Sequence, residues 1–256
     1  MNQKFNYSKE FYQSVDNRAS ETAKIMFQEL RSYLSVTSIV DAGCGSGAWV
    51  RTAIEEGLIQ AFGVDLNSSL NLIKKDKSFE EMLTNNNLIL IERDFVEDSK
   101  SGLPAADLAI CLEVAEHLPP EIAESLVARL TEASSFVVFS AAQPGQGGTY
   151  HINERPVEYW VEEFAKYNFD PFDPFREILR SSQSVPRFYA LNMLLFVSRG
   201  SLNTDKRVLN KTALNNVKVV RKDQLDKRTL IEKIRYAFIK TLPVKIVTEL
   251  SKRFKY

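Results

Sequence analysis

The sequence predicts an α/β protein built around a doubly wound, mostly parallel β-sheet. Apolar runs of strand length occur at residues 38–42, 61–64, 88–91, 108–112, 136–140 and 191–197. Helix-like segments separate most of these runs, at residues 48–56, 121–130 and 157–167. Because strands that are apolar along their whole length are buried on both faces, their alternation with helices is typical of a parallel sheet covered on both sides.

The length and composition fit one such domain with an appendage. The chain has 256 residues, of which 44% are hydrophobic, and this is enough for a sizeable core. Cys44 and Cys111 lie in apolar runs and are interpreted as small buried residues, which favours a reducing compartment. No stretch approaches the ~20 apolar residues that span a bilayer, and the N-terminus lacks the apolar core of a signal peptide. We therefore expect a cytoplasmic protein.

The chain begins with one or two predicted helices over residues 8–34, and the first predicted strand follows. That strand leads directly into Gly43, Gly45 and Gly47, in the stretch "SIVDAGCGSGAWV". A dinucleotide-binding turn has the spacing G-x-G-x-x-G, whereas this turn has G-x-G-x-G. Together with the preceding Asp41, this spacing resembles motif I of the class I S-adenosylmethionine-dependent methyltransferases. The resemblance implies a Rossmann-like fold with a seven-stranded sheet, in which the glycines let the backbone approach the cofactor. A tight turn without a ligand is the alternative.

Two further strand ends carry acidic residues that suit the same cofactor, S-adenosyl-L-methionine. Asp65 ends the run "AFGVDL", where a carboxylate can accept hydrogen bonds from both hydroxyls of a ribose, and its alternative role is to cap the next helix. Asp94 and Phe95 follow the third strand, and the resemblance implies that they contact the adenine amino group and ring. For Asp94 the alternative is a place in a surface loop. Since ligands of open α/β sheets bind at the carboxyl ends of strands, the three signals together indicate this cofactor.

The stretch "CLEVAEHLPPE" after the fourth strand resembles the E-V-x-E-H-L segment of the same superfamily. The resemblance implies that Leu112 and Glu113 line the methionine end of the cofactor. It also implies that Glu116 and His117 begin the wall of the acceptor site, as candidate catalytic residues; the alternative is that they merely start a helix. No Cys/His cluster has metal-ligand spacing, and two glutamates alone do not define a site, so no metal is predicted.

The fifth strand runs into "SAAQPGQGGTYHINERPVEYW", which is predicted to be a loop because its glycines and proline fit neither a helix nor a regular strand. His151 lies on this loop, on the acceptor side, and we interpret it as the candidate base; positioning the acceptor and packing the loop are its alternatives. Glu154 is expected to orient His151 or to complement the N-terminus of the next helix, which Asn153 is expected to cap. The candidates for binding acceptor hydroxyls or closing the site are Gln146, Tyr150, Asn153, Glu154, Tyr189 and Asn192.

The loop also resembles a subgroup of bacterial and viral methyltransferases with the segment P-G-Q-G-G-x-x-H-x-N-E, which matches Pro144 to Glu154. Members are often found near genes for surface glycans, which implies O-methylation of a sugar or glycan hydroxyl. This resemblance covers nearly all of residues 7–198. Methylation of a small lipid or quinone-type precursor is a rival function, and so is a non-catalytic scaffold that binds an adenosyl ligand.

Charge separates a methyltransferase-like domain at residues 1–200 from a tail at residues 201–256. The tail holds 15 Lys and Arg against five Asp and Glu, and the rest of the chain holds 18 against 28. Apolar residues recur at helical spacing from Leu230 to Phe254, with basic residues over 227–256. Such helices suit an anionic membrane surface, where the protein would be peripheral at the inner face. A helix packed on the acidic body is the alternative, and nucleic-acid binding is not expected because the apolar stripe would stay uncovered.

Overall fold

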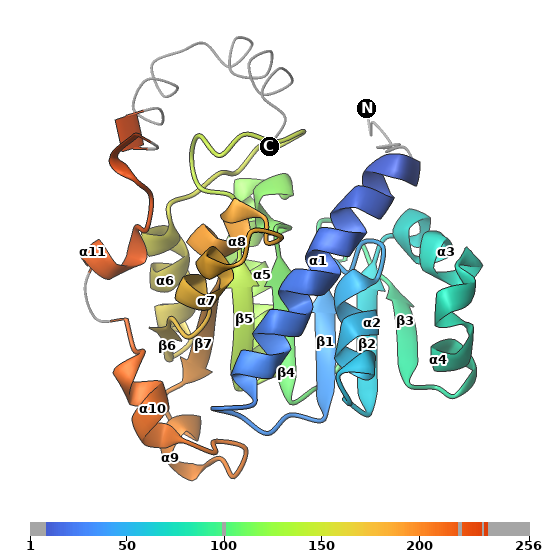
Figure 1. Cartoon of the computed structure of the whole chain (residues 1–256), viewed down its shortest axis with the longest axis horizontal. Coiled ribbons are helices and arrows are strands. Elements are labelled where there is room, and N and C mark those ends of the chain that lie inside the picture. The colour runs from blue at the N-terminus through green and yellow to red at the C-terminus, as the bar shows by residue number, and fades with distance from the viewer. Residues whose placement is uncertain (1–8, 99–100, 220–221, 232, 235–256) are drawn as a thin grey trace.

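A seven-stranded sheet forms the centre of the computed structural model, which describes residues 9–98, 101–219, 222–231 and 233–234 (Figure 1). The strands are β1 (Ser38–Ala42), β2 (Gln60–Asp65), β3 (Leu88–Glu92), β4 (Leu108–Leu112), β5 (Phe136–Ser140), β6 (Phe169–Phe172) and β7 (Leu194–Ser198). Their order across the sheet is β3-β2-β1-β4-β5-β7-β6, with β7 antiparallel to both neighbours and the other described pairs parallel. The predicted doubly wound, mostly parallel sheet is confirmed.

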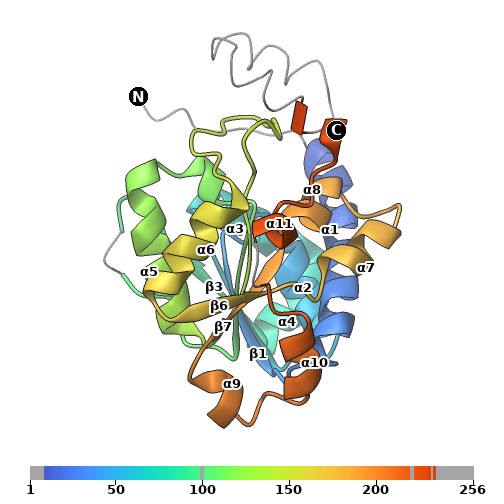
Figure 2. The same ribbon diagram turned by 90° about the vertical axis from the view of Figure 1, so that its left-hand side faces the viewer.

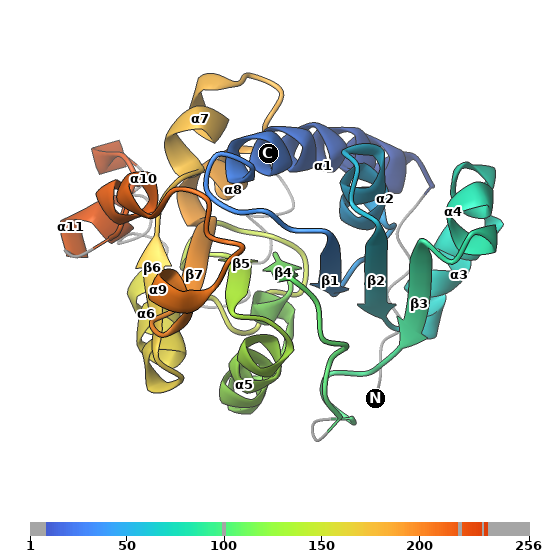
Figure 3. The ribbon, with the colours of Figure 1, turned by 90° about the horizontal axis from the view of Figure 1, so that it is seen from below.

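Helices cover both faces of this sheet, as the view from below shows (Figure 3). The longer ones are α1 (Lys9–Leu30), α2 (Ala48–Glu55), α3 (Asn67–Lys75), α5 (Ala123–Ala133) and α6 (Val157–Lys166). The shorter ones are α4 (Glu80–Thr84), α7 (Arg176–Ser181), α8 (Arg187–Asn192), α9 (Ser201–Thr204), α10 (Lys211–Asn216) and α11 (Lys222–Leu225), with 3-10 turns η1 (Lys77–Phe79), η2 (Ala115–His117) and η3 (Pro120–Ile122). Helices α1, α2, α7 and α8 lie on one face, and α5 and α6 on the other.

The two cores follow from the alternation of side chains along each strand. In β1, Ile39 packs into the core beneath α1 and α2, whereas the next residue, Val40, packs into the core beneath α5 and α6. In β5, Phe136 and Val137 divide in the same way, and all four side chains are fully buried. Continuous apolar runs were therefore the right signal for strands covered on both faces.

The last part of the sheet differs from the sequence-based expectation. The predicted strand over 191–197 is instead the end of helix α8 up to Asn192, and β7 begins only at Leu194. A short apolar run cannot be assigned to strand or helix by periodicity alone, which explains this error. The edge strand β6 was not among the predicted runs; it contains Pro171, and an edge strand tolerates a residue without a backbone N–H.

Residues 201–219 and 222–225 lie against the body near the β6 edge of the sheet (Figure 2). Leu214, Val219 and Leu225 are buried there, and the Arg207 guanidinium donates a hydrogen bond to Asp107 Oδ1 at 3.0 Å. The domain boundary at residue 200 stays a prediction. The predicted pair of basic amphipathic helices, residues 230–254, lies largely outside the described residues.

Cys44 and Cys111 are both buried and are not bonded to each other, as expected for small core residues. No helix in the described part of the chain is both long and apolar enough to cross a membrane.

Candidate active site

The glycine turn between β1 and α2 has three residues in the left-handed half of backbone space. Gly43, Gly45 and Gly47 have φ values of 91°, 54° and 86°. An added Cβ at Gly43 would lie 2.4 Å from Val114, and one at Gly47 would lie 2.9 Å from Phe79, so packing within the chain already requires glycine there. At Gly45 an added Cβ would meet nothing within 4 Å. The backbone of the turn is therefore open at Gly45.

Asp65 is brought to this open point by the neighbouring strand. Its Oδ2 accepts a hydrogen bond from the backbone N–H of Gly45 at 2.8 Å, and its Oδ1 accepts one from Leu66 N–H at 2.6 Å. Burial raises the pKa of this carboxyl. The N-cap of α3 is Leu66, without a side-chain cap, so the alternative role of Asp65 as the helix cap is wrong.

Asp41 adds a second carboxyl next to the turn. It is 2% exposed, and its Oδ2 has no hydrogen-bond partner among the described residues. Burial and the negative charge of Asp65 raise its pKa well above the usual value for an aspartate. An orphaned buried carboxyl is costly to a folded protein, and such groups are typical of sites that bind a ligand or water.

Asp94 and Phe95 follow β3, on the same edge of the sheet as Asp65. Asp94 Oδ1 accepts hydrogen bonds from Val96 N–H at 2.8 Å and Glu97 N–H at 3.2 Å, so the carboxyl shapes the turn in which it lies. Phe95 is 6% exposed, and the Arg129 guanidinium lies over its ring at 5.2 Å. Both residues thus have local structural partners, and their contact with adenine stays a prediction.

Glu113 lies directly after β4 and joins the cofactor side to the loop. Its φ of 56° is unusual for a residue with a side chain, since the left-handed region costs about 1–2 kcal/mol. The carboxylate accepts hydrogen bonds from Gln146 Nε2 at 2.9 Å and from Asn192 Nδ2 at 3.3 Å. Asn192 Nδ2 also donates to Gln146 Oε1, and Gln143 Nε2 donates to Asn192 Oδ1. One network therefore unites Glu113 with two predicted acceptor residues.

Leu112 and Tyr189 border this network. Leu112 is the buried last residue of β4, and Tyr189 is a buried residue of α8 that meets the Trp49 ring edge to face at 5.6 Å. Burial and the charge of Glu113 raise the pKa of Tyr189, so its phenol is neutral at physiological pH. Tyr189 thus lies near the site, as expected, but on a helix and not on the last strand.

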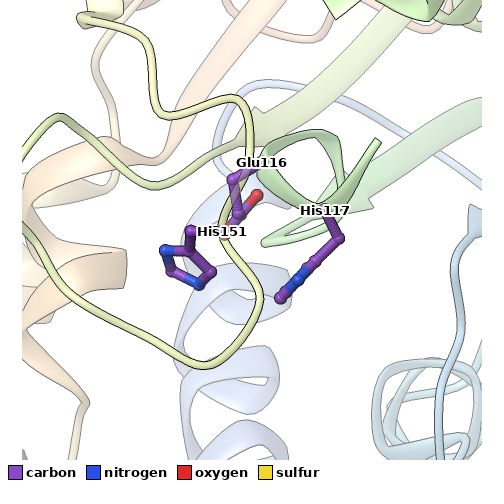
Figure 4. A group of neighbouring side chains, drawn as sticks. All are labelled: Glu116, His117 and His151. Atoms are coloured by element: carbon purple, nitrogen blue, oxygen red, sulfur yellow. The ribbon is translucent and has the colours of Figure 1, made fainter. Parts of the chain in front are cut away.

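A second group of side chains gathers beside this network, where η2 meets the loop after β5 (Figure 4). Ligand-type atoms of Glu116, His117 and His151 all lie within 4.8 Å of one another. The two imidazole rings meet edge to face, with centroids 4.9 Å apart. The loop is held here because Ile152 N–H and Asn153 N–H both donate to the Glu116 carbonyl, at 2.9 and 3.0 Å. The chain has only these two histidines, and the fold brings them together.

Burial shifts the pKa values of two members of this group, Glu116 and His117. Glu116 is 1% exposed, and burial together with the charge of Glu113 raises its pKa well above the usual value for a glutamate. His117 is an exposed residue, but neighbouring protein atoms withdraw part of its ring from water, and this together with the adjacent His151 lowers its pKa to about 4. His117 is therefore neutral at physiological pH.

Glu154 orients His151, as one of the sequence-based alternatives expected. The His151 Nδ1 and Glu154 Oε1 atoms are 3.0 Å apart, and Glu154 Oε2 accepts a hydrogen bond from Gly145 N–H at 2.8 Å. An ionised carboxylate only accepts, so this contact favours a proton on Nδ1, and in the neutral imidazole Nε2 then keeps its lone pair. Gly148 makes room for the ring, because an added Cβ would lie 2.2 Å from His151 Nε2.

Asn153 departs from one of its expected roles. The N-cap of α6 is Pro156, without a side-chain cap, so the predicted capping by Asn153 is wrong. Asn153 is buried and donates to the Ala115 carbonyl at 3.4 Å while accepting from Arg155 Nε at 2.8 Å. It fixes the loop to η2. Tyr150 is 48% exposed with a φ of 66°, and its role in acceptor binding stays a prediction.

The sequence analysis missed two features of this site. Gln143, 2% exposed, belongs to the network around Glu113, and a polar residue just after a wholly apolar strand was the available signal. Spacing along the chain indicated no metal cluster, whereas the fold gathers three ligand-type side chains from two segments. Their segments follow the neighbouring parallel strands β4 and β5, which was the signal for their proximity.

Comparison with models of protein families finds no match to this chain, and comparison with curated proteins finds none either. Solved structures do share its fold. Magnesium protoporphyrin IX methyltransferase from Synechocystis PCC 6803, with bound SAH, has a TM-score of 0.54 and 18% identity over 77% of this chain and 90% of its own. Human N-acetylserotonin methyltransferase, in complex with SAM, has a TM-score of 0.53 and 16% identity over 73% of this chain.

The pyocyanin biosynthetic protein PhzM has a TM-score of 0.51 and 16% identity over 70% of this chain. The matched region spans only 55% of the length of PhzM and 55% of the human enzyme. At these identities the likeness concerns the fold, and the chain has the class I methyltransferase fold.

Proposed function

We propose that this protein is an S-adenosylmethionine-dependent methyltransferase. The observation that carries the proposal is the open backbone at Gly45, which hydrogen-bonds to Asp65 at the end of the neighbouring strand. Asp41 supplies a buried carboxyl oxygen that lacks a partner among the described residues. An open glycine backbone and two carboxyls fit the polar ribose and amino-acid parts of this cofactor. Two of the similar enzymes were solved with SAM or SAH, which supports the choice.

The acceptor we propose is a hydroxyl group. When bound, the cofactor supplies a methyl group on a positively charged sulfur, which the acceptor oxygen attacks as the carbon–sulfur bond breaks. His151 takes the hydroxyl proton at Nε2, since Glu154 keeps the proton on Nδ1. Glu154 is thus a positioning residue. The network of Glu113, Gln146 and Asn192 holds the loop after β5 against the end of β4. It thereby fixes the cofactor side of the site relative to the acceptor side.

For the acceptor class we propose a sugar or glycan. Support comes from the resemblance of the loop, Pro144 to Glu154, to methyltransferases associated with surface-glycan genes. Polar side chains at the site suit an acceptor with several hydroxyls: Gln146 is partly exposed, and Tyr150 is exposed. A small lipid or quinone-type precursor would need a larger apolar surface and is the rival.

We also propose that the C-terminal tail binds an anionic membrane surface at the cytoplasmic face. In its described part, Leu230, Ile231 and Ile234 are 73%, 78% and 60% exposed. Basic side chains lie close to them in the sequence, from Lys227 onward. An exposed apolar group flanked by cations is the composition that inserts into the boundary of an anionic bilayer.

The cofactor proposal is tested by isothermal titration calorimetry with S-adenosylmethionine and S-adenosylhomocysteine. Both should bind, and Asp65→Ala should weaken both, whereas NAD should not bind comparably. Tight NAD binding without adenosyl-ligand binding would overturn the assignment.

The acceptor is tested by incubating the protein with cofactor labelled in the methyl group and with separate sugar, lipid and protein fractions. Label in the sugar fraction supports the proposal, and label in the lipid fraction supports the rival. Cofactor binding without transfer to any fraction supports the non-catalytic scaffold. Once an acceptor is known, His151→Ala should lower turnover about 10²–10⁴-fold without changing cofactor affinity.

A further inference from the structure

We propose that Glu116, His117 and His151 form a binding site for one divalent first-row transition-metal ion. The proposal rests on the arrangement of these three side chains and does not depend on the proposed methyl transfer. They come from two segments, η2 and the loop after β5, and converge on one point (Figure 4). Two imidazoles and one carboxylate are a common set of ligands for such ions.

The distances are close to those that a metal requires. One donor atom from each residue lies within 4.8 Å of the other two. An ion with metal–ligand distances of ~2.0–2.2 Å holds neighbouring ligand atoms about 3–3.5 Å apart. The donors therefore need to approach by roughly 1–2 Å, which rotation of side chains can supply. His117 is the exposed member of the three.

The imidazoles are oriented as metal ligands usually are. Glu154 Oε1 lies 3.0 Å from His151 Nδ1 and leaves Nε2 as the free donor atom. The His117 ring forms a hydrogen bond to the backbone of Tyr150. Metal-binding histidines generally donate their second N–H to a carboxylate or a backbone carbonyl, which fixes the ring and its tautomer. Both rings here have a partner of that kind, so one nitrogen of each remains available.

Glu116 supplies the strongest reason for a cation. Its side chain is almost completely buried, and neither carboxylate oxygen meets full hydrogen-bond geometry with a described residue, although backbone groups of Glu116 and Ala142 and the Glu113 carboxyl lie close enough to shift its pKa. Glu113 adds a second carboxyl nearby, half-buried and close enough to raise the pKa of Glu116. A buried carboxyl is costly to ionise unless a positive charge lies beside it. A divalent ion would supply that charge and would satisfy Glu116 directly.

The donor set also indicates the kind of ion. Mg²⁺ and Ca²⁺ prefer oxygen ligands only, whereas two imidazole nitrogens with one carboxylate favour first-row transition-metal ions such as Fe²⁺, Co²⁺ or Zn²⁺. Three protein ligands leave coordination positions open. A metal at His151 Nε2 would use the lone pair that a direct base role requires, so the two roles of His151 exclude each other. Metal dependence of turnover will decide between them.

The test is metal binding by the untagged, full-length protein after dialysis against a chelator. Co²⁺ bound to the protein should give visible d–d absorption bands, and the electron paramagnetic resonance signal of free Mn²⁺ should disappear on binding. Each titration should saturate at one equivalent of metal per chain. His117→Ala and Glu116→Gln should each weaken Co²⁺ binding at least tenfold, and Glu154→Gln by roughly 10–100-fold. Glu121→Gln is the matched control, because Glu121 is an exposed carboxylate in the next 3-10 turn, η3, and it should bind like the wild type.

The outcomes separate this proposal from the methyltransferase assignment. Absence of Co²⁺ and Mn²⁺ binding at millimolar concentration would overturn the metal site, and so would binding that survives His117→Ala together with His151→Ala. Circular dichroism of each variant checks folding, and exposed His117 is the position where loss of the fold is least expected. S-adenosylmethionine affinity, measured in parallel, should be unchanged in every variant. If the metal fails to bind and the cofactor still binds, the proposed function stands.

Discussion

Replacing Gly45 with alanine tests whether a ligand approaches the backbone of the glycine turn. Gly45 has a φ of 54°, and an added Cβ would meet nothing of the protein within 4 Å. The substitution therefore leaves packing unchanged and costs only the backbone strain of a left-handed residue, about 1–2 kcal/mol. Any larger effect on ligand binding has to come from a collision between the new methyl group and the ligand.

Gly57→Ala is the matched control for Gly45→Ala. Gly57 lies just after α2, away from the carboxyl edge of the sheet, with a φ of 95° and likewise nothing within 4 Å of an added Cβ. Both variants should lose similar stability. In a chain of this size each kcal/mol lowers Tm by roughly 2–4 °C.

The two variants should differ in ligand binding. We expect Gly45→Ala to weaken S-adenosylmethionine and S-adenosylhomocysteine at least tenfold, equivalent to about 1.4 kcal/mol, and Gly57→Ala to bind both normally. At a ligand concentration 100 times the wild-type Kd, ligand stabilises the wild type and Gly57→Ala by about 2.7 kcal/mol but a tenfold weaker variant by only ~1.4 kcal/mol. Calorimetry measures the affinities, and thermal unfolding with and without ligand measures how much the ligand stabilises each variant.

Two results would refute this reasoning. Wild-type affinity in Gly45→Ala would mean that no ligand approaches the turn at this residue. Equal loss in Gly57→Ala would mean that strain alone, and not contact with the ligand, weakens binding.

Three further predictions concern the loop, the acid stability and the tail. Gly148→Ala would place Cβ 2.2 Å from His151 Nε2, so the imidazole ring must move. Turnover in the labelled-methyl assay should therefore fall about 10²-fold or more. Gly102→Ala is the control and should leave turnover unchanged, because an added Cβ there meets no atom within 4 Å. Burial raises the pKa of Asp107, but hydrogen bonds from Thr37 and Arg207 outweigh it and lower that pKa on balance. Asp107 therefore stabilises the fold above the unfolded-state pKa of ~3.9, and this stabilisation is lost as pH falls through the folded-state pKa. In urea unfolding, the Asp107→Asn variant should be less stable than the wild type at pH 7. Its free energy of unfolding should also change less when the pH is lowered. Removing residues 229–256 should abolish sedimentation with anionic vesicles without changing cofactor affinity, and salt should weaken the wild-type association; a truncated chain that still sediments would contradict the membrane proposal.

Most of the fold could be predicted from the sequence because its signals are local. Apolar runs such as Leu108–Leu112 become strands buried on both faces, and the predicted positions of β1 to β5 agree with the structure within about a residue. The glycine spacing after β1 and the acidic residues at or near the carboxyl ends of β1, β2 and β3 marked the carboxyl edge of the sheet. These features depend only on neighbours in the chain and on the rule that ligands bind at that edge.

The assembly of the site depended on the tertiary structure. Asn192 was predicted to lie at the last strand, but it belongs to α8, and it reaches Gln146 and Glu113 only because β7 runs antiparallel beside β5. His117 and His151 are 34 positions apart in the chain, and their contact requires the loop to bond to the Glu116 carbonyl. Periodicity reports which face of an element is buried, whereas contacts between loops follow from strand order, register and hydrogen bonds between distant segments. For that reason the edge of the sheet that would bind the cofactor could be predicted from the sequence. The cluster of two histidines and a glutamate could be identified only from the folded structure.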